Sequence, residues 1–240
     1  MHHKMKVEVW SDVMCPFCYI GKRHYEQALA QFAENQQVEI VWKSFQLDPS
    51  IPEHFEQKPD LYEYLADRKG ISVAQSRQMH DNVVAMAKNA GLNYNFDHAV
   101  VANSFKAHRV IQLAKSKGLG DAMEECLFRA YFTEGQDFGS TAVLIELGKS
   151  IGLAENEIAD ALENDHFAQL VQQDLQEAQY IGVTGVPFFV FNRQYAVSGA
   201  QPTPVFLETL QKSFAAWQRE HAKPVLETVE GQVCTPDGDC

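Results

Sequence analysis

The chain has 240 residues, of which 45% are hydrophobic and 22% charged, and its formal net charge at pH 7 is −12. This hydrophobic content suffices for a packed globular core. An acidic chain has no general attraction for phosphate backbones or anionic lipid, so neither nucleic acid nor a membrane surface is an expected partner. The sequence also lacks an apolar run of about 18 residues, the length that a membrane-spanning helix needs.

Residues 1–6 (MHHKMK) contain no apolar segment of the kind found in secretory signals, which favours a cytoplasmic location. In a reducing cytoplasm, the five cysteines are not expected to form a disulfide scaffold. A Cys-x-x-Cys pair in that setting is more often catalytic or metal-binding.

The first part of the chain predicts a β-α-β unit. Residues 6–10 and 38–45 are typical of strands, the first by alternation and the second by its β-branched and aromatic content. Between them, apolar residues recur at the spacing of one helix face: Tyr25, Ala28, Leu29 and Phe32. A β-α-β unit predicts that its two strands are parallel.

The middle of the chain predicts a helical block. Pro49, Pro52 and Pro59 interrupt the pattern first, and Gly91 and Gly118 end two of the later stripes. Ser140 or Thr141 and Asp165 are the expected caps of two further helices. The helical stripes consist of Met79, Val83, Ala87 and Ala90; of Val100, Ser104, His108 and Ile111; and of Met123, Leu127, Ala130 and Tyr131.

Strand signals return at residues 186–191, followed by a hairpin turn at 192–194 and a short strand at 195–197. A last helix is expected over residues 203–220, with Val205, Phe206, Leu210, Phe214 and Trp217 on its inner face. Two-stranded pieces are barely stable alone, so the strands from both ends must form one sheet. The chain therefore divides into residues 1–48 with 182–222, a helical insertion at 49–181, and a tail at 223–240.

Cys15-Pro16-Phe17-Cys18 lies between the first strand and the first helix. A cysteine at a helix N-terminus faces unpaired N–H groups and the positive end of the helix dipole, which stabilise its thiolate. Cys15 is therefore the expected nucleophile, and Cys18, one turn further on, can resolve a mixed disulfide. Pro16 suits the first helical position, where no N–H partner is required.

Other interpretations of the pair stay open. Half of a zinc site needs two more ligands, which Cys234 and Cys240 could supply, although their spacer is longer than usual. The pair could also be structural. Cys126 lies beside Leu127 on a predicted helix and is expected to be an inert buried thiol.

Residues 10–21 (WSDVMCPFCYIG) resemble the active-site segment of the DsbA-like family, specifically of its FrnE-type branch. Residues 181–190 (IGVTGVPFFV) resemble the family's cis-proline segment, and residues 103–109 (NSFKAHR) resemble a stretch of its helical insertion. The resemblance extends over about residues 6–217. It implies an α/β thioredoxin-like fold (β-α-β … β-β-α) with a large all-helical insertion.

The resemblance further implies that the Val186–Pro187 bond is cis and that the Val186 backbone can pair with an extended substrate chain. Pro187 would otherwise be expected to be an ordinary strand-initiating proline. Pro16 and Phe17 are candidate substrate contacts beside these two residues.

One position departs from the family pattern. Relatives carry a buried acid six residues before the first cysteine, where this chain has Val9. Asp12 is a candidate proton relay, but turn formation also suits it. His108 is either a cleft residue near Cys15 or a core histidine that is hydrogen-bonded within the insertion. Tyr19 belongs either to a substrate surface or to the core.

The sequence thus predicts a dithiol oxidoreductase that acts on disulfides of proteins or small molecules through Cys15 and Cys18. No bound cofactor or metal is expected, and glutathione is a candidate co-substrate. Cys234 and Cys240 are a candidate second redox pair, as in FrnE-type proteins, or a passive pair. The oligomeric state is not indicated, and a dimer is one candidate.

Two other functions remain as alternatives. One is a glutathione-dependent isomerase or transferase, like 2-hydroxychromene-2-carboxylate isomerase or the kappa-class transferases, which resemble the chain in fold but typically have serine where Cys15 stands. The other is a binding module or holdase that keeps zinc between two cysteine pairs.

Overall fold

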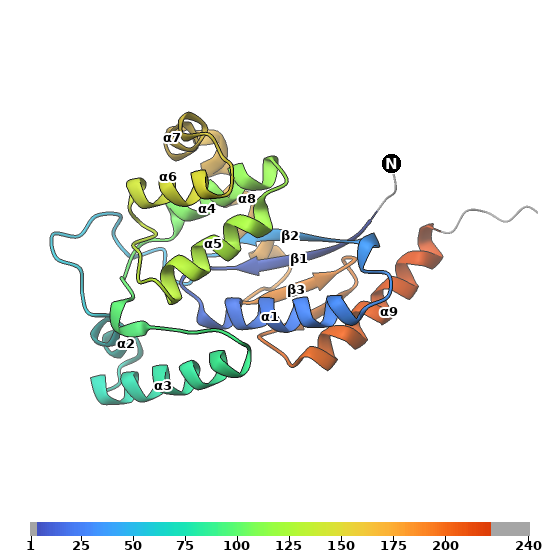
Figure 1. Ribbon diagram of the computed structural model, residues 1–240, viewed down its shortest axis with the longest axis horizontal. Helices are drawn as coiled ribbons and strands as arrows, with labels where there is room; N and C mark the ends of the chain where they lie inside the picture. Colours follow the sequence, from blue (N-terminus) through green and yellow to red (C-terminus); the bar gives the residue numbers. More distant parts are fainter. Residues whose placement is uncertain (1–3, 222–240) are drawn as a thin grey trace, which may run out of the picture.

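A four-stranded mixed sheet lies at the centre of the computed structural model, which describes residues 4–221 (Figure 1). Its strands run in the order β2-β1-β3-β4. β1 pairs in parallel with β2 and antiparallel with β3, which pairs antiparallel with β4. The strands are β1 (Met5–Ser11), β2 (Val38–Ser44), β3 (Phe188–Phe191) and β4 (Tyr195–Ser198). The predicted parallel pair and the predicted joining of both chain ends in one sheet are confirmed.

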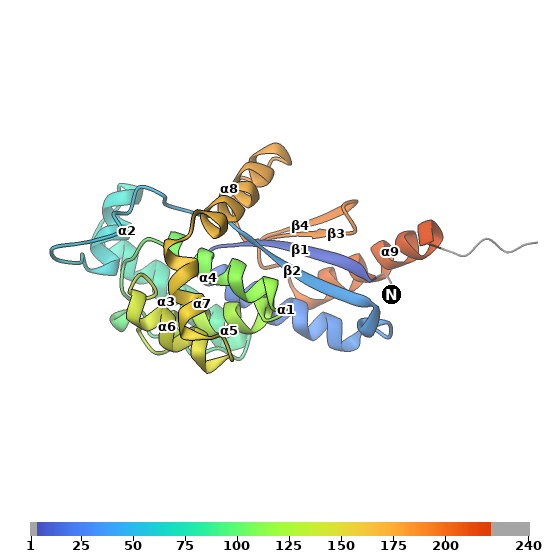
Figure 2. The same ribbon diagram turned by 90° about the horizontal axis from the view of Figure 1, so that it is seen from above.

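Helices α1 (Pro16–Gln31) and α9 (Thr203–His221) cover one face of the sheet, and α8 (Asp165–Tyr180) lies on the other (Figure 2). The alternation in β1 explains this, because successive side chains of a strand point to opposite faces. Val7 and Val9 pack with α1 and α9, whereas Trp10 packs toward α8 and donates its Nε1–H to the Asp174 carbonyl at 3.1 Å.

The remaining helices lie between β2 and β3 in the chain, as the predicted insertion requires. They are α2 (Leu61–Lys69), α3 (Val73–Asn89), α4 (Phe105–Ser116), α5 (Gly120–Phe132), α6 (Thr141–Ser150) and α7 (Glu155–Glu163). Two short 3₁₀ turns, Asn35–Gln37 and Phe96–His98, complete the described elements. α4 contacts α5, α6, α7 and α8, so it forms the centre of this bundle. In residues 4–221, no helix is both long and apolar enough to cross a bilayer.

Helix α1 joins the sheet to the insertion. Tyr25 faces the sheet, where its ring lies 5.7 Å from that of Phe189. Tyr19, on another face of α1, stacks on Phe128 of α5 at 5.0 Å. Cys15 and Cys18 belong to the same buried cluster as the insertion helices. The start of α1 is therefore enclosed between the sheet and the helical bundle.

Several local predictions are confirmed. The stripe on α5 is buried as expected, and the hairpin turn has the type I′ form. Asn192 and Arg193 both have positive φ, and the Gln194 amide donates to the Phe191 carbonyl at 3.0 Å.

Other local predictions are incomplete or wrong. No separate helix was predicted at residues 61–69, where α2 lies, and α4 begins only after Val100 and Ser104. Asn164 caps α8 in place of Asp165, because its side chain accepts the His166 amide at 2.8 Å. Val205 is 38% exposed and does not belong to the inner face of α9.

Candidate active site

Cys15 occupies the position immediately before the first residue of α1. Its backbone is extended, its amide donates to the Asp12 carbonyl at 2.9 Å, and its carbonyl accepts the Cys18 amide at 3.0 Å. Its sulfur therefore stands where Ser or Asp would cap a helix, beside unpaired N–H groups. No acidic residue lies in the first turn of α1, so no negative side chain there weakens the positive potential of the helix N-terminus at Cys15.

Cys18 lies behind Cys15 and is fully buried. Burial raises the pKa of Cys18 well above its usual range, and a hydrogen bond with Cys15 and the charge of Cys15 raise it further. The Ser11 hydroxyl and the Asp12 amide act in the opposite direction on this pKa. Cys18 is therefore held as a thiol at neutral pH.

The loop before β3 meets the active-site helix from the other side. The Val186–Pro187 bond is cis, as the resemblance implies, and the Cys15 thiol donates to the Val186 carbonyl at 3.4 Å. Pro187 packs on α1 at Gly21, where an added Cβ would lie 3.1 Å from the proline Cγ. The absence of a side chain at Gly21 thus permits this close approach.

Cys15 opens onto a cleft of about 460 Å³. Its own sulfur-bearing side chain is only 3% exposed, so a substrate must enter the cleft to reach it. Phe17 and Met79 are 37% and 40% exposed at the cleft. The lining residues are Met14, Cys15, Pro16, Phe17, Leu47, Leu61, Tyr64, Leu65, Arg68, Lys69, Met79, His80, Val83, Phe96, Tyr131, Gly185 and Val186.

The cleft is mainly apolar, with two basic residues at the end of α2. Arg68 donates to the Leu47 carbonyl at 2.6 Å and pairs with Asp48, whereas Lys69 is exposed. The basic side chains of the cleft thus lie at the C-terminus of α2, and Lys69 is the one of the two without a carboxylate partner in the described part of the chain.

The structure brings together most of the predicted site residues. Cys15, Pro16, Phe17 and Val186 line the cleft, and Pro187 lies directly beside it. Sequence reasoning missed the contribution of α2 and α3. The Met79 and Val83 stripe was visible, but the half-exposed position of both residues at the cleft was not.

Asp12 and His108 meet beneath the loop, away from the cleft. Both are fully buried, and Asp12 Oδ1 lies 3.5 Å from His108 Nε2. His108 is a core residue, as one of its two interpretations expected. It does not line the cleft, and neither ring nitrogen has the expected hydrogen bond within the described part of the chain. The turn role of Asp12 is confirmed, since its carboxylate accepts the amides of Met14 at 3.4 Å and Leu47 at 2.7 Å.

Two tyrosines support the start of α1. The Tyr94 hydroxyl, which sequence reasoning missed, donates to the Pro16 carbonyl at 2.7 Å. Tyr19 is a core residue, and its hydroxyl donates to Glu125 at 2.6 Å. Burial raises the pKa of both phenols, so both stay protonated at neutral pH.

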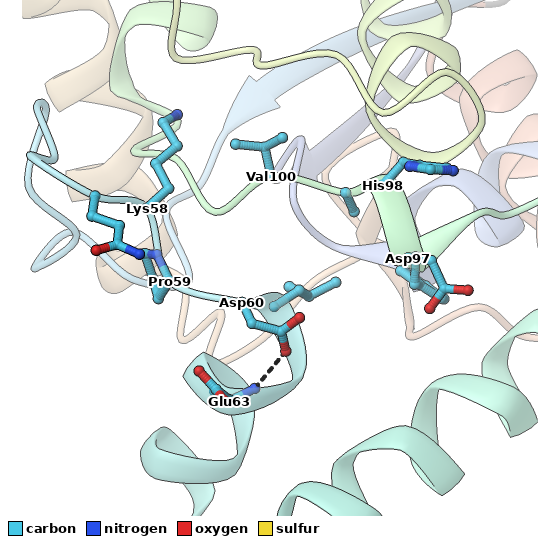
Figure 3. Close-up of a pocket in the computed structure, with 11 residues that line it drawn as sticks. Lys58, Pro59, Asp60, Glu63, Asp97, His98 and Val100 are labelled. Atoms are coloured by element: carbon cyan, nitrogen blue, oxygen red, sulfur yellow. Dashed lines mark hydrogen bonds between the residues drawn. The ribbon is translucent and has the colours of Figure 1, made fainter.

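A second pocket of about 680 Å³ adjoins the cleft, since Leu61 and Phe96 line both (Figure 3). Asp60 caps α2 by accepting the Glu63 amide at 3.1 Å, and Asp97 accepts the Tyr62 hydroxyl at 2.8 Å. Both carboxylates therefore have structural partners. No cysteine lines this pocket, whereas Cys15 lines the neighbouring cleft.

Within residues 4–221, no group of three or more His, Cys, Asp and Glu side chains could hold a metal ion. Cys126 is buried, and its sulfur lies 3.5 Å from the Ser150 hydroxyl. Cys234 and Cys240 lie outside the described residues, so the structure does not test a second redox pair or a shared zinc site.

The profile of the DSBA-like thioredoxin domain family matches residues 6–211, and the chain belongs to this family. A probable DsbA oxidoreductase from Streptomyces coelicolor is 35% identical and has a TM-score of 0.82, with 98% of each chain covered. The Bacillus subtilis protein YwbO, which is uncharacterized, is 26% identical over 205 residues, or 83% of this chain and 92% of YwbO.

Two more distant structures share the fold. The cytosolic disulfide reductase DsbM from Pseudomonas aeruginosa, solved with GSH, is 18% identical with a TM-score of 0.59, covering 90% of this chain and 98% of that one. A 2-hydroxychromene-2-carboxylate isomerase is 15% identical with a TM-score of 0.61, covering 91% and 98%. The thioredoxin-like fold with a helical insertion is thus common to both.

Proposed function

We propose that this protein is a thiol–disulfide oxidoreductase in which Cys15 is the nucleophile and Cys18 the resolving thiol. The observation that carries this proposal is the arrangement of the two sulfurs. Cys15 faces the cleft at the N-terminus of α1, while Cys18 is fully buried one turn behind it. The 35% identical relative, described as a probable DsbA oxidoreductase, supports the same chemistry.

In the reductive direction, the Cys15 thiolate attacks one sulfur of a substrate disulfide. The S–S bond of the substrate breaks, and the departing sulfur takes a proton, which leaves a mixed disulfide on Cys15. Cys18 then loses its proton and attacks the Cys15 sulfur, so the second substrate sulfur leaves as a thiol. The enzyme is oxidised by two electrons and the substrate is reduced by two; the reverse sequence oxidises a dithiol.

Pro16, Phe17, Val186 and Pro187 are the proposed substrate contacts. The Val186 carbonyl already binds the Cys15 thiol, so it lies within reach of a chain attached to that sulfur. An extended peptide could pair with the Val186 backbone as an added strand. Glutathione is the proposed small co-substrate, and the neighbour solved with GSH supports it. The chemistry itself needs no bound cofactor.

The test is turnover of a protein disulfide with glutathione as reductant. Cys15→Ser should lose essentially all activity, and Cys18→Ser should accumulate a mixed disulfide that mass spectrometry detects on Cys15. Cys126→Ser is the matched control, because Cys126 is buried in the insertion, and it should keep the wild-type rate. Full activity of Cys15→Ser would contradict the mechanism.

A glutathione-dependent isomerase of the 2-hydroxychromene-2-carboxylate type is the second candidate. Arg68 and Lys69 beside the apolar cleft favour it, because they could hold a carboxylate of an aromatic substrate. Glutathione binding without disulfide turnover, together with isomerase activity that survives Cys15→Ser, would support this alternative.

The remaining assignments are part of the same proposal. We place the protein in the FrnE-type branch on the strength of residues 10–21, and in the cytoplasm, where the neighbour DsbM is described as acting. Cys234 and Cys240 are proposed to exchange disulfides with Cys15 and Cys18. Replacement of both by serine should slow reoxidation of the Cys15–Cys18 pair without changing its first attack, as stopped-flow alkylation can measure.

A further inference from the structure

The first turn of α1 accepts a hydrogen bond from a hydroxyl that the exchange steps above do not use. Tyr94 lies between α3 and the 3₁₀ turn Phe96–His98, and its hydroxyl donates to the Pro16 carbonyl at 2.7 Å. Tyr94 is only 8% exposed and does not line the cleft. A substrate in the cleft therefore does not meet this side chain, and any effect of Tyr94 on the reaction must pass through α1.

Packing against the helical insertion fixes the ring of Tyr94. The ring stacks on Phe132 with ring centres 4.7 Å apart and meets Phe96 edge-on at 5.5 Å. The amide of the neighbouring Asn95 donates to the Phe132 carbonyl at 2.7 Å, which holds the backbone beside Tyr94. The hydroxyl is therefore aimed at the Pro16 carbonyl without a further loss of side-chain freedom.

The Pro16 carbonyl and the Phe17 N–H belong to one peptide group. Phe17 is the second residue of α1, and the N–H at that position is one of those that a capping side chain reaches. Pro16 has no N–H, and the Cys18 amide already donates to the Cys15 carbonyl at 3.0 Å. A hydrogen bond to the carbonyl of a peptide group polarises its N–H and makes it a stronger donor. The Tyr94 hydroxyl thus strengthens the first amide of α1 that is available to the Cys15 sulfur.

Such a donor is needed when Cys15 ionises. The Cys15 thiol donates to the Val186 carbonyl at 3.4 Å, but a thiolate has no proton to donate and must accept hydrogen bonds instead. Burial raises the pKa of Tyr94, and negative charge on Cys15 and Cys18 raises it further. Tyr94 therefore keeps its proton, and remains a donor, while Cys15 is charged.

Given the dithiol chemistry of the proposed function, we propose that Tyr94 is a positioning residue that favours the reduced form of the active-site pair. Its hydroxyl acts on the Cys15 thiolate through the peptide group of Pro16 and Phe17. The thiolate carries a full charge and the disulfide none, so a stronger N–H donor lowers the free energy of the reduced form and leaves the oxidised form almost unaffected.

The electrons and protons of this reduction balance with glutathione as the reductant. Two electrons break the S–S bond and give the Cys15 thiolate and the Cys18 thiol. Two glutathione molecules supply these electrons, and their sulfurs join in glutathione disulfide. Of the two protons that they lose, one goes to Cys18 and the other to solvent.

The test is the equilibrium of the full-length protein with reduced and oxidised glutathione at pH 7, read by alkylation and peptide mass spectrometry at Cys15 and Cys18. Tyr94→Phe keeps the packed ring and removes only the hydroxyl. This variant should be about fivefold harder to reduce than wild type, or about 20 mV for a two-electron couple.

Tyr25→Phe is the matched control and should follow wild type. Tyr25 is also buried, lies on α1 itself, and has a hydroxyl without a hydrogen-bond partner among residues 4–221. Equal reduction of Tyr94→Phe and wild type, or an equal change in Tyr25→Phe, would overturn the proposal.

A second measurement observes the Phe17 amide itself. In nitrogen-15 NMR spectra, the Phe17 amide proton of wild type should move downfield when a phosphine reduces the pair, and it should move clearly less in Tyr94→Phe. Equal movement in both proteins would exclude Tyr94 from the mechanism and leave the roles of Cys15 and Cys18 intact. Failure of the wild-type pair to exchange with glutathione would instead contradict the proposed function, and this proposal with it.

Discussion

At the scale of single residues, the two active-site sulfurs differ because their surroundings differ. The positions of Cys15 and Cys18 at the start of α1 could be predicted from the sequence, and their proposed roles follow from those positions. The contact between Asp12 and His108 could not, because no local pattern joins a loop to a helix so far along the chain. The same limit applies to the burial of Glu124, because Asp121 and Glu125 near it in the sequence suggest an exposed polar face.

The stability of the protein should report the protonation of Glu124. Burial raises its folded-state pKa from 4.5 to about 7, so the folded protein holds this proton more tightly than the unfolded chain. The contribution of this proton to the unfolding free energy is fully present below pH 4.5 and is lost as the pH rises through about 7. Between pH 5 and pH 8, wild type should lose about 2 to 3 kcal/mol of unfolding free energy relative to Glu124→Gln.

Urea denaturation at the two pH values provides this comparison. Glu163→Gln, at the exposed end of α7, is the control and should show no such difference from wild type. An equal gap between wild type and Glu124→Gln at pH 5 and pH 8 would mean that Glu124 is ionised in the same way in the folded and unfolded states.

At the scale of elements, a charged cluster around Asp174 connects α8 to β2 and α4. Asp174 accepts the Ser44 amide of β2 at 2.9 Å and the Gln112 side chain of α4 at 2.6 Å, and it pairs with Lys43 and Lys115 at 3.0 and 3.4 Å. Burial alone would raise the pKa of Asp174, but Lys115, the Ser44 amide and Lys43 together lower it.

Asp174→Asn should therefore destabilise the protein by about 3 kcal/mol at pH 7, because partly buried lysines lose their counter-charge. A depressed folded-state pKa contributes stability above the unfolded value of about 3.8 and loses it as the pH falls through the folded value. The gap between variant and wild type should thus narrow at pH 3, as urea denaturation can show. Asp165→Asn, in the exposed first turn of α8, should cost far less at either pH.

Helix boundaries show where periodicity stops being informative. The α5 stripe and the strands could be predicted because burial follows a regular spacing there. Val100 and Ser104 share the helical spacing of His108, yet they precede the helix. α4 begins at Phe105, whose amide donates to the Asn103 side chain at 2.9 Å. Helix α2 was missed because it has only nine residues and follows a proline-rich stretch, and its cap at Asp60 was not recognised.

At the scale of the whole molecule, the sheet and the insertion share one interior. The predicted domain boundaries at residues 49 and 181 stay a prediction. The aromatic stack of Tyr19 and Phe128 joins the two parts, so they pack against each other through side chains of both. Trp42 of β2 also meets Phe128, with ring centres 6.4 Å apart. The cleft could not be predicted for the same reason, because it forms where α2 and α3 approach the loop that carries Cys15.

We therefore expect one cooperative unfolding transition. All three tryptophans lie in β1, β2 and α9, so their fluorescence reports the sheet side, whereas far-ultraviolet circular dichroism mainly reports the helical insertion. The two signals should coincide in urea. Phe128→Ala should lower the unfolding free energy obtained from each signal by the same amount, about 3 to 5 kcal/mol. A lower value from the dichroism signal alone would show that the two parts unfold independently.

The sheet order also has a consequence for synthesis on the ribosome. β1 needs β3 as its second neighbour, yet β3 emerges only after the whole insertion has been translated. At typical elongation rates this delay lasts roughly 10 to 30 s, and a two-stranded piece is not stable meanwhile. The nascent chain therefore exposes Cys15 and Cys18 to oxidants and chaperones before the finished protein buries them.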